Sequence, residues 1–172
     1  MNYHEKKTIV TSIVGLLVSI SYIVFAIVKY NQASPESLTL KFWSMRMLIF
    51  IGIGIVAIII LLILFNIFYS IYLAIKLKID NPELSDKEIE AQISQTVKTN
   101  TIEDEMAKLI ELKSMRFSFA FVGFGFVLAL VSLLLDFSPI IMLNILFLSF
   151  SLGQTLEGFV QLFYYKRGIN HG

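Results

Sequence analysis

Three polar side chains that could bind a proton or a cation lie close together near the end of an otherwise apolar chain. Gln154, Glu157 and Gln161 follow one another at intervals of three and four residues, which places them within about 60° on one face of a helix. A carboxylate between two amides can exchange a proton, bind a cation or form hydrogen bonds to neighbouring helices. These residues are the candidate polar site of the chain.

The segments around this site are too apolar for an ordinary soluble domain. Of the 172 residues, 56% are hydrophobic and 16% are charged, and the mean hydropathy is +0.77, whereas soluble domains carry about 25% charged residues. Four stretches, 8–28, 47–75, 117–135 and 140–163, reach the roughly 20 apolar residues that a membrane-spanning helix needs. We expect an all-α integral membrane protein with four transmembrane helices, forming a single membrane domain over residues 1–172.

The lengths and separations of these stretches refine the expectation. The second exceeds what a bilayer requires, so it should tilt or project from the membrane. Only Asp-Phe-Ser-Pro, residues 136–139, separates the third from the fourth, which predicts an antiparallel hairpin. The apolar run 9–28 is longer than the core of a signal peptide, so the first stretch is expected to remain as a span.

The distribution of Lys and Arg predicts the orientation, because cytoplasmic loops are enriched in these residues. With the N-terminus inside, eleven lie on the inner side, namely Lys6, Lys7, Lys76, Lys78, Lys87, Lys98, Lys108, Lys113, Arg116, Lys166 and Arg167. Only Lys29, Lys41 and Arg46 lie outside. Both termini are therefore expected in the cytoplasm, and the protein in the plasma membrane.

The long loop 76–116 is predicted to form a cytoplasmic amphipathic helical segment between the second and third spans. Ser85 and Glu88 have the spacing of a capping box, flanked by Leu84 and Ile89 as a hydrophobic staple. The apolar repeat changes phase at 99–101, where a second helix should begin and continue into the third span. The apolar residues are Ile89, Ile93, Val97, Ile102 and Met106. They could lie on the bilayer, pack on each other, or bind a cytoplasmic partner.

Glu157 is expected below the cytoplasmic surface of the fourth span. It precedes Lys166 by nine residues, or about 13 Å along a helix. A charge at such a depth is costly unless it is paired, buried in protein or in contact with water. The candidate charge partners are Arg116, Lys113 and Lys7. A structural hydrogen bond, a proton- or cation-binding role and a contact with another membrane subunit all remain open.

Small residues within the spans are typical of close helix packing. Thr11, Gly15 and Ser19 are spaced by four, as are Ser149 and Gly153. Two further pairs, Gly52 with Gly54 and Gly123 with Gly125, could pack in the same way or add flexibility.

Other classes of site lack the necessary residues. The chain has no cysteine, and His4 and His171 lie at its ends, so neither a metal site nor a cofactor is expected. No phosphate-binding loop, nucleophile elbow or zinc-protease motif occurs, and we expect no enzymatic activity. The net charge of +1 does not indicate a nucleic-acid partner.

Two stretches, "EDEMAKLIELKSMRFSF" at 103–119 and "SPIIMLNILFLSFSLGQTLEGFVQLFYYKRG" at 138–168, resemble a group of small uncharacterised bacterial multi-span membrane proteins. In that group an acidic start, a Leu-Ile pair and a Lys–Arg pair precede a two-helix hairpin that ends in aromatic and basic residues. The matching residues are Asp104, Glu105, Leu109, Ile110, Lys113, Arg116, Tyr164, Tyr165, Lys166 and Arg167. Met106 stands where the group has a basic residue. The group is often encoded beside helix-turn-helix regulators, so the resemblance implies a membrane component of a regulatory or stress-response system.

Two functions are compatible with these features. The first is a non-enzymatic membrane protein that acts through its cytoplasmic helical loop on a cytoplasmic or membrane protein partner. The alternative is a small oligomeric transporter or channel, coupled to protons or cations, that uses Glu157. In both, the lipid bilayer surrounds the chain, and a homo-oligomer is compatible with the sequence.

Overall fold

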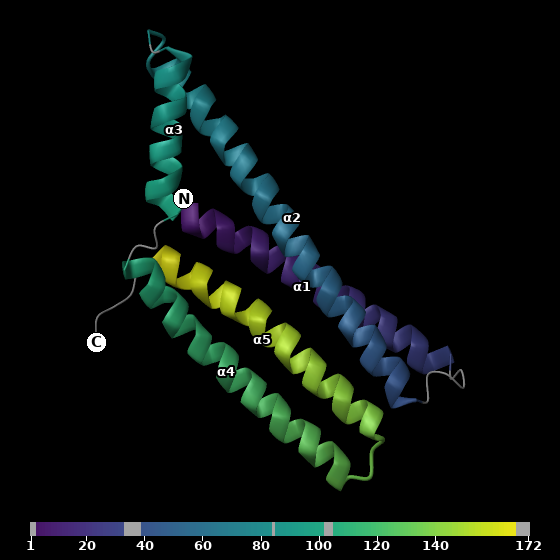
Figure 1. Ribbon diagram of the computed structural model, residues 1–172. Helices are drawn as coiled ribbons and strands as arrows, with labels where there is room; N and C mark the ends of the chain where they lie inside the picture. The colour runs from purple at the N-terminus through teal and green to yellow at the C-terminus, as the bar shows by residue number, and fades with distance from the viewer. Residues whose placement is uncertain (1–2, 33–38, 84, 102–104, 168–172) are drawn as a thin grey trace.

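The computed structural model describes residues 3–32, 39–83, 85–101 and 105–167, and these residues form an all-α fold (Figure 1). The helices are α1 (Tyr3–Gln32), α2 (Leu40–Asp80), α3 (Asp86–Thr101), α4 (Glu105–Leu134) and α5 (Pro139–Arg167). Within these ranges, α1, α2, α4 and α5 are long and apolar enough to cross a membrane. The four expected spans are therefore confirmed as helices; α1, α2 and α5 extend beyond both expected bounds, whereas α4 begins earlier than expected and ends at Leu134, one residue before the expected end.

The sequence explains where several helices begin. The Thr39 side chain accepts a hydrogen bond from the Phe42 amide at 3.3 Å and caps α2. Between α4 and α5, Asp136 has a φ of 59°, a left-handed conformation that Asp tolerates better than most residues. Pro139 then occupies the first position of α5, where its missing N–H costs nothing. The predicted antiparallel hairpin is confirmed.

The helix α5 is at the centre of the arrangement. It contacts α4 on one side and α1 on the other, and α2 packs mainly on α1 (Figure 1). Near the start of α2, Tyr22, Trp43 and Met47 form a buried apolar cluster. By contrast, no residue is buried in the most apolar stretch of α2.

The segment between α2 and α4 contains the predicted amphipathic helix. The Ser85 amide and hydroxyl donate to Glu88 Oε2 at 2.9 and 2.7 Å, and the Glu88 amide donates to Ser85 Oγ at 3.4 Å. This confirms the capping box, while Leu84, its expected staple residue, lies outside the described residues. The C-terminal part of α2 extends past the start of α1, and α3 folds back beside it (Figure 1).

The second helix predicted in this segment is continuous with the third span. α4 begins at Glu105 and runs to Leu134. Residues 76–116 thus comprise the end of α2, all of α3 and the first turns of α4.

Candidate functional site

An interface of small and hydroxyl residues joins α1 to α5. Tyr22 Oη donates to Asn144 Oδ1 at 2.6 Å, and the Ser19 and Ser151 hydroxyls share a hydrogen bond of 2.6 Å. Nearer the N-terminus of α1, Thr8 Oγ1 donates to Gln161 Oε1 at 3.2 Å. The partners run in opposite directions along the chain, so the two helices are antiparallel and linked along most of their lengths.

Glycines bring the backbones of α1 and α5 together at two positions in this interface. A Cβ added to Gly158 would overlap the Ser12 side chain, and one added to Gly15 would lie 3.2 Å from Thr155 Oγ1. The α1 residues of the interface, Thr8, Ser12, Gly15, Ser19 and Tyr22, alternate in steps of four and three. Gly15 and Ser19 were expected in a packing stripe. Thr11, expected with them, donates its hydroxyl to backbone carbonyls of its own helix.

The opposite side of α5 packs equally closely on α4. A Cβ added to Gly125 would overlap Ser149, and one added to Gly153 would lie 2.8 Å from Val122 and 3.3 Å from the Ser118 hydroxyl. Ser149, Gly153 and Gly125 are thus packing residues. At Gly123 and Gly52, an added Cβ would meet nothing within 4 Å.

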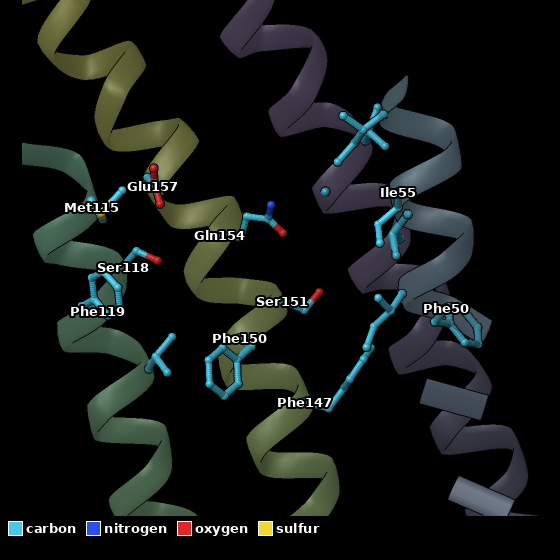
Figure 2. Close-up of a pocket in the computed structure, with 17 residues that line it drawn as sticks. Phe50, Ile55, Met115, Ser118, Phe119, Phe147, Phe150, Ser151, Gln154 and Glu157 are labelled. Atoms are coloured by element: carbon cyan, nitrogen blue, oxygen red, sulfur yellow. The ribbon is translucent and has the colours of Figure 1, made fainter. Parts of the chain in front are cut away.

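Between these two interfaces, a third face of α5 lines a groove of about 580 Å³. The other walls come from α1, α2 and α4, and Figure 2 shows Glu157 and Gln154 together with Ser118 of α4 and Phe50 of α2. Most of the lining is apolar. The lining residues are Val14, Gly15, Val18, Phe50, Ile51, Gly54, Ile55, Ile58, Met115, Ser118, Phe119, Val122, Phe147, Phe150, Ser151, Gln154 and Glu157.

Glu157 is half-buried in the groove wall, and its hydrogen-bond partner belongs to its own helix. Gln161 Nε2 donates to Glu157 Oε1 at 3.3 Å. Within the described ranges, the candidate partners Lys7, Lys113 and Arg116 form no ion pair with it. The charged side chain that acts on Glu157 electrostatically is another carboxylate, Glu111 of α4.

A second, polar pocket of about 190 Å³ adjoins the site at the end of the bundle that carries the N-terminus of α1. Its lining residues are His4, Lys7, Thr8, Thr11, Ala107, Glu111, Gln161 and Tyr165. Gln161 lines this pocket, accepts from Thr8 and donates to Glu157. The predicted trio is therefore brought together: Gln154 and Glu157 face the groove, and Gln161 connects Glu157 to the polar pocket.

The predicted partner surface on the connecting segment is partly covered by the chain itself. Ile89 is only 7% exposed, Ile93 and Val97 are half-buried, and α3 contacts α2. Met106 is 45% exposed on the separate helix α4. Ile102 lies outside the described residues, as does Asp104.

Sequence reasoning missed the hydrogen bonds of Tyr22, Ser19 and Thr8 to α5, and it missed Glu111. The alternating four- and three-residue spacing of small residues in α1 was the available signal for the interface. No signal pointed to Glu111, which is one of several charged residues in the first turns of α4.

Chemically, the site offers one carboxylate, two amides and two serine hydroxyls beside an apolar groove. Among the described residues, no three His, Cys, Asp or Glu side chains converge as they would around a metal ion. No protein-family model, curated protein or solved structure matches this chain.

Proposed function

We propose that the chain is a small plasma-membrane transporter or channel, coupled to protons or cations, in which Glu157 is the coupling carboxylate. In this proposal α1, α2, α4 and α5 cross the bilayer, and both termini and α3 lie in the cytoplasm. The four long apolar helices and the asymmetry of Lys and Arg support this arrangement.

The observation that carries the proposal is the position of Glu157. Its carboxylate lines an apolar groove, and no ion pair in the described part of the chain balances its charge. An acidic residue within a span is costly and is usually retained for a function. A bound proton or cation would supply the missing charge.

A purely structural role explains the site less well. The contacts that join α5 to α1 and α4 are made by Ser, Thr, Tyr, Asn and Gln side chains and by close approaches at glycines. The hydrogen bond of Glu157 to Gln161 lies within one helix, and Glu157 reaches α1 only indirectly, through the bond that Gln161 accepts from Thr8. Glu157→Gln keeps an acceptor for Gln161 and would leave the glycine contacts of both helix interfaces in place.

The two cavities supply the routes that coupling needs. Glu157 faces the groove directly and reaches the polar pocket through Gln161. The polar pocket lies at the proposed cytoplasmic end and is lined by His4, Lys7 and Glu111, side chains that hold water and exchange protons. A proton from the cytoplasmic side and a cation in the groove would therefore bind the same carboxylate in turn, which is what coupling requires.

The test is proton flux in proteoliposomes that contain a pH-sensitive dye. We expect wild-type protein to dissipate an imposed pH gradient and Glu157→Gln to lose this activity while unfolding at the same temperature. Glu105→Gln, which removes the same charge in the exposed first turn of α4, should retain it. Flux equal in wild type and Glu157→Gln, or no flux above that of empty liposomes, would contradict the proposal.

The second candidate is an interaction protein of a bacterial regulatory or stress-response system. It is favoured by the position of α3 beside the projecting end of α2, with Lys87, Glu88 and Glu90 exposed. Because the apolar face of α3 is partly covered, a partner would bind the charged face. A photo-crosslinking residue placed at Glu90 should then form an adduct with the partner. The same residue placed at the exposed Ile63 of α2, as a control, should not. A specific adduct at Glu90 alone supports this candidate, and equal labelling at both sites contradicts it.

A further inference from the structure

The groove beside Glu157 has the size and chemistry of a site for a small organic molecule. Its volume of about 580 Å³ falls within the roughly 300–1,000 Å³ of typical ligand sites. Such sites combine an apolar lining with a few convergent polar groups. Here the apolar part includes four phenylalanines, Phe50, Phe119, Phe147 and Phe150.

The groove also has an apolar side through which a membrane-dissolved molecule could enter. Its walls include α2, which packs on α1, and α4, which packs on α5. Ile51 and Ile55 of α2 and Phe119 of α4 line the groove and are at the same time exposed on the outside of the helices.

The charge of the groove lining then indicates which charge its ligand must carry. Among the described residues that line the groove, Glu157 alone is charged. Ser151 is already hydrogen-bonded to Ser19, which leaves Gln154 and Ser118 as neutral polar groups. A neutral molecule or a lipid tail would give no counter-charge to the ionised carboxylate, and an anion would be repelled by it.

An inorganic cation suits the groove less well than an organic one. Divalent cations such as Ca²⁺ take six or more oxygen ligands, and the groove offers one carboxylate among mostly apolar side chains. Aromatic rings, by contrast, attract organic cations through their faces. Phe150 is 62% exposed and makes no ring–ring contact with another described residue, so its ring is available.

We propose that this groove binds a lipophilic organic cation, with the Glu157 carboxylate as its counter-ion and Phe150 against its apolar body. This inference rests on the proposed function, for which it names the class of substrate. It assigns separate roles to the two cavities: the groove holds the cation, and the polar pocket is the side from which the proton reaches Glu157, while Gln161 orients the carboxylate by its hydrogen bond.

Equilibrium binding to the full chain in nanodiscs of zwitterionic lipid tests the inference without requiring transport. The probe is tetraphenylphosphonium, measured by equilibrium dialysis against empty nanodiscs, and triphenylphosphine oxide serves as a neutral analogue. We expect saturable binding of the cation and none of the neutral analogue. Glu157→Gln should weaken binding about tenfold, equivalent to about 1.4 kcal/mol, and Glu105→Gln should leave it unchanged.

A second pair of variants tests the aromatic contact. Phe150→Ala should weaken binding severalfold, whereas Phe126→Ala, which removes a ring of α4 that is 52% exposed and does not line the groove, should have no effect. All variants are checked by thermal unfolding, so a loss of binding in a folded protein is assigned to the site.

Each other result overturns the inference. Binding that is equal in wild type and Glu157→Gln, binding of the neutral analogue to the same extent, or no binding above that of empty nanodiscs means that the groove does not select cations. The variant Ile55→Cys tests whether a second copy of the chain occupies the groove. If a disulfide forms between two copies of this variant and cation binding is lost as it forms, the occupant is the second copy. Proton flux without cation binding refutes this inference alone, and cation binding without flux refutes only the proposed function.

Discussion

The helices α5 and α2 are both long and apolar, yet they pack in opposite ways. α5 lies between α4 and α1, and its buried residues are Ser149, Gly153 and Thr155. α2 carries large aliphatic side chains, and no residue of its most apolar stretch is buried. Between apolar helices in lipid the hydrophobic effect gives no net attraction, so close contact depends on small residues and hydrogen bonds. Side-chain size, not hydrophobicity, therefore distinguishes the central helix from the peripheral one.

The contrast is repeated among the faces of α5. The two faces with glycine and serine are closed against α1 and α4, whereas the face with Phe150, Gln154 and Glu157 borders the groove. The larger polar and aromatic side chains prevent a third close contact. This leaves room for a ligand at the face that carries the carboxylate.

The largest effect is expected from enlarging a closed face. Gly125→Leu would force a side chain into the space occupied by Ser149, and overpacking of this kind costs about 1–3 kcal/mol or more. We expect strongly reduced resistance to SDS-induced unfolding, followed by the fluorescence of Trp43, which is buried and is the one tryptophan of the chain.

The matched control lies two residues away. Gly123→Leu adds the same side chain where nothing lies within 4 Å, and replacing an exposed helix glycine can gain up to about 1 kcal/mol. If both variants unfolded at the same SDS concentration, the assignment of the α4–α5 interface to these residues would be wrong.

The next effect separates the packed start of α2 from its exposed surface. Met47 is 5% exposed in the cluster with Tyr22 and Trp43, whereas Met45 is 62% exposed. Met47→Ala should cost about 2 kcal/mol, the lower end of values for truncating a core methionine. Met45→Ala should change stability by less than about 0.5 kcal/mol. Thermal unfolding in one detergent compares the two, and a loss of equal size at both positions would contradict the packing described.

A smaller effect is expected from a single hydrogen bond between α1 and α5. Tyr22→Phe removes the donor to Asn144 from a fully buried ring. Hydrogen bonds between membrane helices contribute on average about 0.6 kcal/mol and at most about 1.7 kcal/mol. Tyr72→Phe, at an exposed ring, is the control. A double-mutant cycle with Asn144→Leu measures the coupling energy between Tyr22 and Asn144. A coupling energy of zero would show that this hydrogen bond does not stabilise the interface.

Much of this fold could be predicted because its signals are local. The four apolar stretches, the Asp-Phe-Ser-Pro turn and the Ser85–Glu88 capping box depend on residues close in sequence, and the structure contains each of them. The change of phase at residues 99–101 predicted two helices, but it misplaced the start of the second: α3 continues to Thr101, and α4 begins at Glu105.

The parts that could not be predicted depend on how each helix is rotated about its axis. Ser12 and Ser19 donate hydrogen bonds to carbonyls of their own helix, as serines in any apolar helix can, so their sequence positions do not reveal α5 as the neighbour. The side-chain partners of Glu157 depend in the same way on the rotation of α4, which the Gly125–Ser149 contact sets. Lys113 and Arg116 were at suitable depths, but depth alone did not place them against the carboxylate.

The smallest effect concerns the capping box of α3, the part of the connecting segment that sequence predicted best. The Ser85 hydroxyl and amide donate to the Glu88 carboxylate, and these bonds hold its pKa below the usual value. A group whose pKa is lower in the folded state stabilises it above the unfolded pKa, about 4.3 for Glu, and loses this contribution as pH falls through the folded value. The start of α3 should therefore fray on acidification below about pH 4.

Hydrogen exchange of the 85–92 peptide, compared between wild type and Glu88→Gln at each pH, separates the effect of the carboxylate from the intrinsic pH dependence of exchange. Protection that falls in parallel in both proteins would show that the Glu88 charge does not stabilise the helix start. A fall in wild type alone would make α3 the acid-sensitive element of a bundle whose α1–α5 and α4–α5 interfaces rest on neutral side chains.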